Sequence, residues 1–433
     1  MVDFPTDNHG WSELLSPRLV VDSIQGAHRV PWVIVGGGLT GLACARRLAE
    51  LYPNDEVLLL DARLIGQGAS GRNSGFAVGV SHFPGPYKIQ DKENIDRVNR
   101  INQAGLALLD QQITSQSIHC QWDNNGFHHG AADTMSIKEH GHFVNYLDAI
   151  EAEHNSLNED DMKSRFGTSL YKAGVHVKTG ALVQPAALVR GLANNIPSNV
   201  RLIENCPVLK IKSGRTIKIT TSSGEITTDK LVLATNYEAP KIGFLKRRVL
   251  GSTLSGSFTR ILTPQELATL GSHESWGIIS LHSGGATLRL TSDGRISLRN
   301  TAEYNGGALL SPQALKRRQI THRNSFEKRF PQLAEVPFEF AWSGVEGISR
   351  NDTNFFGQQS KNIFLAGGYN GSGVSRGTAF GYALAEYAGG GQSELITDCL
   401  RSKAASWLPP RPFLDLGAIL KVKARFQGAG LDR

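Results

Sequence analysis

Hydrophobic residues near the start of the chain follow a strand–helix–strand pattern. Residues 33–35 and 57–60 are short, unbroken apolar runs, which favour strands of a sheet that is covered on both faces. Between them, residues 39–51 carry apolar side chains at the three- and four-residue spacing of a helix that packs through one face. The three segments together predict a βαβ unit.

The rest of the chain divides into helical stretches, apolar strands and a long alternating region. Helices are predicted over residues 91–115, 137–152, 185–193, 312–330 and 374–387, and strands within 173–183 and at 200–203, 208–211, 217–221, 225–228, 231–234 and 363–366. Alternating strands dominate residues 249–304, where Asp293-Gly294 marks a hairpin turn. Residues 1 to about 30 have a mixed pattern and are expected to form an arm packed on the surface. The chain is therefore predicted to carry nucleotide-type elements at both ends, with an antiparallel sheet inserted between them.

Three glycines join the first predicted strand to the first predicted helix, as Gly36-x-Gly38-x-x-Gly41. Gly36 permits a sharp turn, Gly38 leaves room for a pyrophosphate against the backbone, and Gly41 lets the helix pack closely on the sheet. The N-terminus of that helix offers free N–H groups and a partial positive charge to a phosphate. Asp61 ends the second strand, where a carboxylate can accept hydrogen bonds from an adenosine ribose. The unit predicts dinucleotide binding, and at this point both NAD and FAD are open.

The composition narrows the class of protein. The chain has 433 residues, too many for one ordinary core, and its 40% hydrophobic and 20% charged residues indicate a soluble globular protein. The net charge is +7, but no nucleic-acid-binding module surrounds the basic clusters at 246–248 and 316–318, so no nucleic-acid partner is expected. The four cysteines are far apart, which argues against a disulfide framework or a metal site and favours a reducing compartment. Neither a signal peptide nor a membrane-spanning run is recognisable, so a cytoplasmic protein is expected.

Longer stretches of the chain carry a family resemblance. They are VIVGGGLTGLACARRLAE, LLLDARLIGQGASGRNSGF and, near the end of the chain, NIFLAGGYNGSGVSRGTAFGYALAE. These stretches resemble the D-amino-acid-oxidase-like (DAO) family of FAD-dependent oxidoreductases, and within it the γ-glutamylputrescine-oxidase-like branch, from about residue 33 to residue 390. The resemblance implies FAD as a non-covalent cofactor. It also implies an α/β fold, in which a Rossmann-like FAD-binding domain of the glutathione-reductase type carries an inserted antiparallel-sheet substrate domain (α+β).

The pattern and the resemblance together predict a division into domains. The FAD-binding domain comprises residues 1–90, 170–240 and 340–395, and the substrate-binding or cap domain comprises residues 91–169 and 241–339. Residues 396–433 form a basic, amphipathic C-terminal tail. The tail is expected to pack on the body through Leu416, Ile419, Leu420, Val422 and Phe426. The alternative is that the same side chains dock on an anionic membrane or a partner protein.

The resemblance implies cofactor contacts in four places along the chain. In the first βαβ unit they are Gly36, Gly38, Leu39, Thr40, Gly41, Asp61, Ala62 and Arg63, and in the GASGRNSG segment and just after it they are Ala69, Ser70, Arg72, Asn73, Gly75 and Phe76. Beside the nucleotide they are Val208, Ala234, Thr235 and Asn236, and beside the flavin they are Gly368, Gly371, Ser372, Gly373 and Val374. Two positions depart from the family pattern: Asn236 replaces a glycine, and Ser372 stands where many relatives carry histidine.

The chemistry implied by the resemblance is oxidation of a C–N bond in an amine or amino acid. In the family, hydride moves from the carbon that bears a neutral amine to flavin N5, and oxygen or another acceptor then takes the electrons. No side-chain base is obligatory, so catalysis is expected to centre on the flavin. Substrate contacts are expected, each with a structural role as the alternative, among Trp342, Phe355, Tyr304, Arg299 and Tyr369. Of these, Arg299 can pair with a substrate carboxylate, and Phe355 lies in Asn354-Phe355-Phe356, where relatives often have a proline, which hints at a bulkier or more apolar substrate.

Two other functions remain open from the sequence. One is a flavin dehydrogenase that avoids oxygen, passes electrons to a quinone or a carrier protein, and acts on an amine or a hydroxy acid. The other is a non-catalytic flavin-binding protein that contacts a partner through the C-terminal tail. Steady-state peroxide production separates an oxidase from a dehydrogenase, and failure of every substrate to bleach the flavin would favour the non-catalytic protein.

Overall fold

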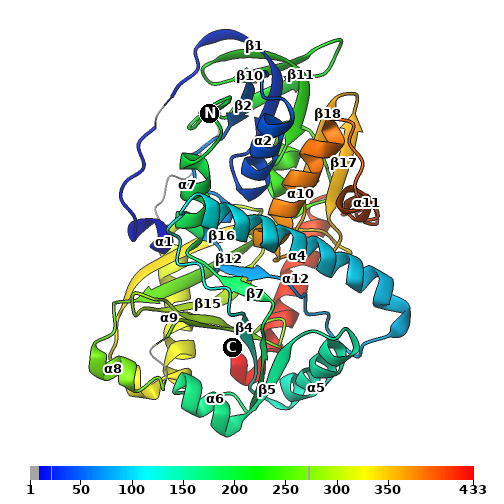
Figure 1. Ribbon diagram of the computed structural model, residues 1–433. Coiled ribbons are helices and arrows are strands. Elements are labelled where there is room, and N and C mark those ends of the chain that lie inside the picture. Colours follow the sequence, from blue (N-terminus) through cyan, green and yellow to red (C-terminus); the bar gives the residue numbers. More distant parts are fainter. Residues whose placement is uncertain (1–8, 21, 272–273) are drawn as a thin grey trace.

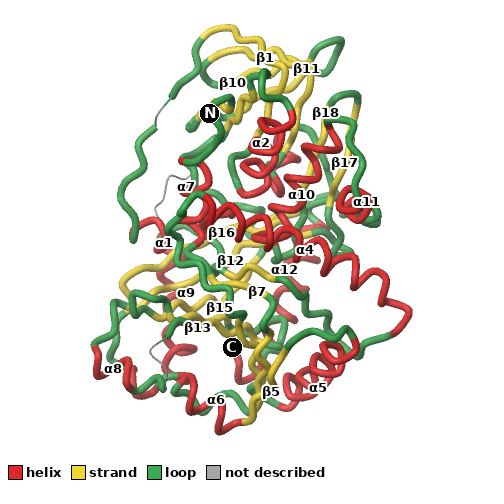
Figure 2. The backbone as a smooth tube through the Cα atoms, viewed as in Figure 1, coloured by secondary structure: helices red, strands yellow, loops and turns green. Residues whose placement is uncertain are grey.

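Two large sheets organise the molecule, one above the other in Figure 1. The computed structural model describes residues 9–20, 22–271 and 274–433. The long helix α4 (Lys92–Ser115) crosses the molecule between the two sheets (Figure 1). Figure 2 shows the same division by secondary structure, with the strands gathered into an upper and a lower group.

The first, upper sheet contains the predicted βαβ unit. Its strands are β1 (Gly26–Val35), β2 (Val57–Leu60), β8 (Val200–Ile203), β9 (Val208–Lys212), β10 (Ile217–Thr221), β11 (Gly224–Leu233), β17 (Phe355–Ser360) and β18 (Ile363–Gly367). The central strands lie in the order β18-β11-β1-β2-β8 and run parallel. β17 adds to β18 in antiparallel fashion, and β10 and β9 continue antiparallel from β11. The predicted α/β architecture is confirmed.

β1 and β11 are longer than the sequence pattern indicates. The predicted strand at 33–35 is only the end of β1, which pairs with β11 from Gly26 opposite Gly224 to Val35 opposite Leu233. The apolar runs predicted as two strands at 225–228 and 231–234 therefore belong mainly to one strand. The extra length comes from backbone hydrogen bonds between the partners, which hydrophobic patterning does not reveal.

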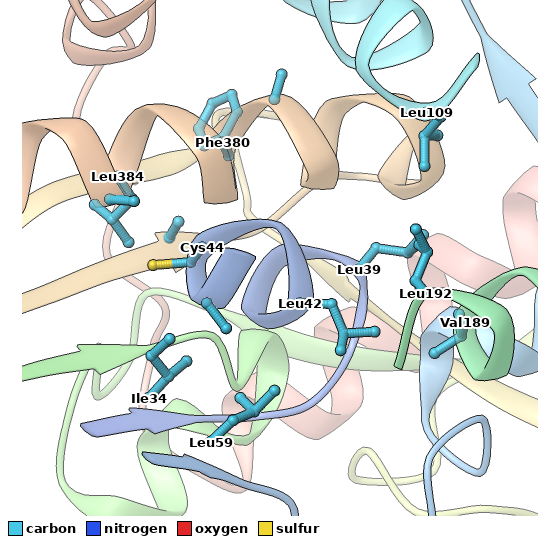
Figure 3. Close-up of a cluster of buried hydrophobic side chains, with 14 of the residues drawn as sticks. Ile34, Leu39, Leu42, Cys44, Leu59, Leu109, Val189, Leu192, Phe380 and Leu384 are labelled. Carbon is cyan, nitrogen blue, oxygen red and sulfur yellow. The ribbon is translucent and has the colours of Figure 1, made fainter. Parts of the chain in front are cut away.

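Helix α2 (Leu39–Leu51) is buried between the first sheet and helix α10 (Gly373–Ala388). In Figure 3, Ile34 and Leu59 of the sheet lie on one side of α2, and Phe380 and Leu384 of α10 lie on the other. Leu109 of α4 packs into the same core. The other helices that accompany this sheet are α3 (Ala69–Arg72), α7 (Pro185–Asn194) and α11 (Glu394–Leu400).

The second sheet is mostly antiparallel, as predicted for the inserted domain. Its strands, in spatial order, are β16 (Phe338–Ile348), β12 (Leu250–Thr259), β15 (Ile296–Glu303), β14 (Thr287–Leu290), β13 (Trp276–Ser280), β4 (Phe127–Ala131), β6 (Ala173–Val177) and β5 (His154–Asn158). β13 and β4 form a parallel pair. The accompanying helices are α5 (Thr134–Ala149), α6 (Glu159–Phe166), α8 (Pro264–Ala268) and α9 (Pro312–Arg329), while β3 (Phe76–Val78) and β7 (Gly180–Leu182) form a separate ribbon.

Sheet membership departs from the predicted domain boundaries in three places. Helix α4 falls in the predicted substrate domain, but it packs against α10 and shares the core of α2. Strand β6 falls in the predicted cofactor domain, yet it is a strand of the second sheet. Most of β16 also falls in the predicted cofactor domain, and the whole of it belongs to the second sheet. The chain therefore passes between the units more often than predicted, because long-range pairing decides which sheet a strand joins.

The start of the segment predicted as a surface arm is anchored in the interior, so the prediction is wrong for residues 9–12, whereas Leu19 and Val20 further along are 79% and 45% exposed. Trp11, in α1 (Gly10–Glu13), is fully buried, and its ring meets Phe258 edge-on at a centroid distance of 4.6 Å. The Trp11 indole Nε1 donates a hydrogen bond of 2.8 Å to the carbonyl of Asn73. Residues 1–8 and residue 21 lie outside the described residues.

The C-terminal tail forms helix α12 (Phe413–Gln427), which packs on the body differently from the prediction. Phe426 is buried, but Leu416, Ile419 and Leu420 are exposed by 61%, 50% and 58%. Beyond the helix, the fully buried Asp432 forms an ion pair with the equally buried Arg329 of α9, which also donates to the Asp432 carbonyl over 2.7 Å. Among the described residues, no helix is long and apolar enough to cross a membrane.

All four cysteines are free and buried in the upper unit. Cys44, Cys120 and Cys399 belong to the core around α2, and Cys206 belongs to the core on the other face of the sheet. Burial raises the pKa of each thiol, that of Cys120 to about 12. The thiols therefore act as small apolar side chains rather than as reactive groups.

Candidate functional site

A cavity of about 1260 Å³ lies between the two units. Its walls come from the glycine turn after β1, the GASGRNSG segment, the strands β12 and β15 of the second sheet, the first turn of α10, and α12. The sequence-predicted cofactor and substrate residues therefore converge largely on one space. Gly41, Gly75, Gly368 and Phe355 are the predicted residues that do not line it.

The glycine turn has the geometry that the motif predicts at two of its three glycines. Gly36 has a φ of +107°, which a side chain would strain. A Cβ on Gly41 would lie 1.8 Å from the carbonyl oxygen of Gly36, so α2 approaches the turn as closely as expected. A Cβ on Gly38 would instead meet the hydroxyl of Ser70 at 2.7 Å, and that hydroxyl accepts a 3.1 Å hydrogen bond from the N–H of Leu39. Gly38 thus makes room for the GASGRNSG segment as well as opening onto the cavity.

Asp61 faces the cavity at the end of β2, as predicted. Its Oδ2 accepts a 2.7 Å hydrogen bond from the N–H of Gly37, and its Oδ1 accepts one of 2.8 Å from the N–H of Arg63. Burial raises the pKa of the Asp61 carboxyl to about 6, against the opposing effect of these two donors. The carboxylate is thus held at the place where it can also accept hydrogen bonds from a ribose.

Arg72 lines the cavity and also joins the GASGRNSG segment to neighbouring backbone through hydrogen bonds. Its Nε donates to the carbonyl of Gln67 over 2.8 Å, and its Nη1 donates to the carbonyl of Ser343 in β16 over 3.0 Å. The side chain therefore ties the segment to the second sheet. A direct contact between Arg72 and a cofactor stays a prediction.

The turn after α3 is shaped by Asn73 and by an arginine from the second sheet. The Asn73 side chain accepts from the N–H of Gly75 at 2.8 Å, and Gly75 has a φ of +75°. A Cβ on Gly75 would lie 2.1 Å from Nη1 of Arg289, a buried residue of β14 that donates to the Gly75 carbonyl over 3.2 Å. Gly75 therefore serves packing and positions the following residue, Phe76, which lines the cavity.

Val208, Ala234, Thr235 and Asn236, which are predicted to lie beside the nucleotide, all line the cavity. Asn236 has a φ of +47°, a conformation that explains why asparagine can replace the family glycine there. The buried Thr235 hydroxyl has no hydrogen-bond partner among the described residues. A buried polar group of this kind suits a bound polar molecule.

The glycine loop before α10 contributes Gly371, Ser372, Gly373 and Val374 to the cavity. Gly368, predicted to contact the flavin, does not line the cavity, and a Cβ there would lie 2.3 Å from the ring of Phe355. Phe355 itself is 6% exposed and belongs to a hydrophobic core, so the prediction that it contacts substrate is contradicted. Tyr369 does line the cavity, and its hydroxyl is hydrogen-bonded to that of Thr40 at 2.7 Å.

The remaining substrate candidates line the part of the cavity that faces the second sheet. Trp342 is largely buried, and its Nε1 donates to the carbonyl of Arg72 over 3.1 Å. The Tyr304 hydroxyl donates to Asp415 of α12 over 2.8 Å, and the guanidinium of Arg299 contacts the Thr287 hydroxyl. The same region is rich in small hydroxyl side chains, namely Ser252, Ser255, Ser280, Thr287 and Ser297.

Sequence reasoning missed two buried arginines, Arg289 in β14 and Arg376 in α10. Burial lowers the pKa of each guanidinium to about 10, so both remain cations at neutral pH. A signal was present, since each is a single charge inside an otherwise uncharged stretch, TLRL and GVSRGTAFG. A lone charge in a buried element is unusual unless it has a partner or a ligand.

These features together fit a dinucleotide cofactor. The cavity is bordered by Gly36, by the buried carboxylate of Asp61 and by the unpaired Thr235 hydroxyl. Helix α2 approaches the backbone of Gly36 closely at Gly41. A second crossing of the same kind lies at α3, where a Cβ on Gly71 would be 2.0 Å from the carbonyl of Gly66. The N-termini of α2 and α3 therefore lie against one cavity, which favours phosphate groups.

Comparison with known proteins gives a consistent result. Residues 31–387 match the family described as FAD dependent oxidoreductase (DAO). The probable oxidoreductase OrdL of Rhizobium meliloti (strain 1021) is 27% identical over 401 residues, which are 89% of this chain and 90% of the relative. The γ-glutamylputrescine oxidoreductase of Escherichia coli (strain K12) is 25% identical over 413 residues, covering 92% of this chain and 90% of the relative. The glycine oxidase structure from Geobacillus kaustophilus superposes with a TM-score of 0.71 at 17% identity, over 84% of this chain and 96% of that one.

Proposed function

Because the chain belongs to the DAO family of FAD dependent oxidoreductases, we propose that it oxidises the C–N bond of an amine or amino acid, with oxygen as the final electron acceptor. One structural observation carries the proposal. The glycine turn that suits the dinucleotide opens into the same cavity as the hydroxyl-rich wall of the second sheet. A relative of similar length is named for an amine substrate, γ-glutamylputrescine.

The residues around the cavity suit non-covalent FAD. The glycine turn and the GASGRNSG segment would hold the pyrophosphate, Asp61 the ribose, and the loop before α10 the flavin. When bound, FAD would supply a two-electron acceptor for oxidation of the carbon that bears the amine. The N–H groups at Gly373 and Val374, at the positive end of the α10 dipole, would stabilise negative charge on a neighbouring group.

The second sheet would bind and orient the substrate. Hydroxyl groups such as those of Ser252 and Ser297 can hydrogen-bond a neutral amine, and Arg299 and Tyr304 add polar groups to the same wall. Trp342 and its neighbour Trp11 form an apolar support behind this wall. The product of hydride loss is an imine, which water hydrolyses, so no side-chain nucleophile is required.

The absorption spectrum of the purified protein, followed by anaerobic addition of amines, amino acids and hydroxy acids, tests this function. We expect flavin bands that bleach with an amine, and hydrogen peroxide in the steady state when oxygen is present. Bleaching without peroxide would favour a dehydrogenase with another acceptor, and bleaching by hydroxy acids alone would contradict C–N oxidation. A protein that stays colourless after incubation with FAD would overturn the proposal.

FAD affinity is expected to depend on pH through Asp61. The ionised carboxylate is the better acceptor for a ribose hydroxyl, and burial places its pKa at about 6. Affinity should therefore be highest above pH 7 and fall as the pH drops through 6, because the carboxyl then becomes protonated. Fluorescence titration of apoprotein with FAD between pH 5 and 8 measures this. The variant Asp61→Asn should bind more weakly and lose most of the pH dependence; an unchanged profile would rule out the role of Asp61.

A further inference from the structure

His82 and Glu139 form a hydrogen-bonded pair at the wall of the cavity. His82 follows β3 in the chain and lines the cavity, and Glu139 lies in α5. Nε2 of His82 lies 2.8 Å from Oε1 of Glu139, and the two side chains are only 16% and 17% exposed. The carboxylate is itself fixed, because the N–H of Gly85 donates to its two oxygens over 2.9 and 3.1 Å. The pair is therefore held in place by the protein alone.

This pairing determines which nitrogen of His82 carries the proton. Burial raises the pKa of the Glu139 carboxyl, but hydrogen bonds from His82 and from the N–H of Gly85 outweigh burial and hold the pKa below its usual range. Ionised Glu139 can only accept hydrogen bonds, so Nε2 of His82 is the donor. In the neutral ring Nδ1 then carries a lone pair, and it has no hydrogen-bond partner among the described residues. His82 therefore brings a free acceptor, backed by a negative charge, to the cavity wall.

A second imidazole lies beside the first. His129 of β4 is 4% exposed and lines the cavity, and its ring centroid is 6.0 Å from that of His82. Burial, together with the neighbouring His82, lowers the pKa of His129 to about 3, so this ring is neutral at physiological pH. Its buried Nδ1 has no hydrogen-bond partner among the described residues. An unpaired polar atom of this kind indicates that the region receives a polar ligand.

A row of aromatic rings connects the two histidines to the part of the wall that is predicted to face the flavin. Phe76 directly follows the GASGRNSG segment, and its ring centroid lies 5.1 Å from that of Phe127. Phe127 in turn lies 5.6 Å from His129, and all these rings line the cavity. Phe127 and His129 belong to β4 of the second sheet. His82 therefore lies on the substrate side of the cavity, three ring contacts from Phe76.

The charges around His82 favour a cation rather than a phosphate as its ligand. Glu139 places a carboxylate directly behind the ring, and α5 adds His142, whose Nδ1 lies 3.3 Å from Oε2 of Glu139. A carboxylate attracts an ammonium group and repels the phosphates of FAD. Arg97 of α4 and Arg376 of α10 also line the cavity. Their positive charges make it easier for an ammonium group bound in the cavity to lose a proton.

We propose that His82, oriented by Glu139, binds the ammonium group of the substrate and takes one of its protons. An N–H bond of the ammonium breaks, its electron pair stays on the substrate nitrogen, and a new N–H bond forms at Nδ1 of His82. The amine is then neutral, as loss of hydride from its carbon requires, and the Glu139 carboxylate stabilises the imidazolium. His82 is thus a catalytic residue and Glu139 a positioning residue. This assignment rests on the proposed function, because it takes the cavity to be the site of amine oxidation.

Redox-inert amines test the binding step on the FAD-loaded protein. tert-Butylamine and 2-aminoisobutyrate have no hydrogen on the carbon that bears the nitrogen, so they cannot reduce the flavin, and tert-butanol and 2-hydroxyisobutyrate are their hydroxyl counterparts. Calorimetry and the flavin spectrum report binding. We expect wild type to bind at least one amine about 10-fold or more tightly than its hydroxyl counterpart. His82→Phe, which keeps a ring without nitrogen, and Glu139→Gln, which removes the charge, should lose this preference.

Anaerobic flavin reduction tests the proton step, with the amine that bleaches wild type fastest in the substrate screen. His82→Gln can still form hydrogen bonds to Glu139 and to an ammonium group, but it cannot take a proton. We expect its limiting rate of reduction to be about 100-fold below wild type at pH 7. The difference should shrink toward about pH 10, where the amine loses its proton to water. Added imidazole should restore part of the rate to His82→Ala, which a purely structural role of His82 would not allow.

His28→Gln is the matched control, because His28 lies in β1, donates to the carbonyl of Gln25 over 2.8 Å and does not line the cavity. It should match wild type in both experiments. An amine preference that survives in His82→Phe or is absent from wild type, or a rate difference that is the same at every pH, would overturn the assignment and leave the proposed function intact. Loss of FAD from every His82 variant would also overturn it, since His82 would then serve the cofactor. Failure of wild type to bind FAD, or of every amine to bleach it, would instead count against the proposed function.

Discussion

Gly41→Ala is expected to yield a protein that binds FAD at least about 100-fold more weakly than wild type. The new Cβ would lie 1.8 Å from the carbonyl oxygen of Gly36. The Cβ is attached directly to the backbone of α2, and the Gly36 oxygen is itself a backbone atom, so neither can rotate away. The clash is relieved only if α2 moves away from the turn that would bind the phosphates. Fluorescence titration of the apoprotein with FAD measures the loss.

Gly141→Ala provides the control for this substitution. Gly141 also lies within a helix, α5, but a Cβ there would meet nothing within 4 Å. FAD affinity should be unchanged, and stability should rise by about 0.5–1 kcal/mol from the better helix propensity of alanine. A yellow Gly41→Ala protein with wild-type FAD affinity would mean that the close crossing of α2 is unimportant for the cofactor.

Asp432→Ala is expected to lower the free energy of unfolding by about 3–5 kcal/mol. The substitution leaves the guanidinium of Arg329 enclosed without its carboxylate, and both side chains are fully buried. Arg329 would keep its bonds to Ser325 in α9 and to the Asp432 backbone, which do not neutralise its charge. Urea denaturation followed by tryptophan fluorescence measures the change.

The neighbouring residue gives a matched control for the loss of the ion pair. Leu431 is 56% exposed, so Leu431→Ala should change stability by no more than about 0.5 kcal/mol. The double variant Arg329→Met/Asp432→Leu removes both charges and should be more stable than Asp432→Ala. Equal stability of Asp432→Ala and Leu431→Ala would argue that the ion pair between Asp432 and Arg329 does not stabilise the fold.

The sequence predicts local features of this protein well where the backbone conformation or a close contact requires one particular residue type, such as glycine. Gly36 adopts the positive φ of the predicted turn, and Gly41 makes the predicted close contact. Asn236 takes a left-handed conformation in place of the family glycine, and Asp293-Gly294 joins β14 to β15. In each case a short motif determines the geometry without help from distant segments.

Features that depend on distant segments were predicted less well. Trp11 belongs to a short segment without periodicity, and its burial depends on distant residues such as Phe258 and Trp342 of the second sheet. Phe355 was assigned to the cavity because Asn354-Phe355-Phe356 stands where relatives often have a proline, but the absence of a side chain on Gly368 leaves room for the Phe355 ring in the core. Arg376 was overlooked because the glycine loop before it dominates the motif, although its charge is the unusual feature of that helix.

The distribution of the cysteines has a consequence for following motions of the enzyme. Each thiol is enclosed in the upper unit, and the second sheet with its helices carries none. A thiol reagent therefore reacts only when the upper unit opens locally. Local opening of the lower unit does not change its rate of reaction. The chain thus contains built-in reporters that separate opening around the cofactor from opening around the substrate, without any engineered label.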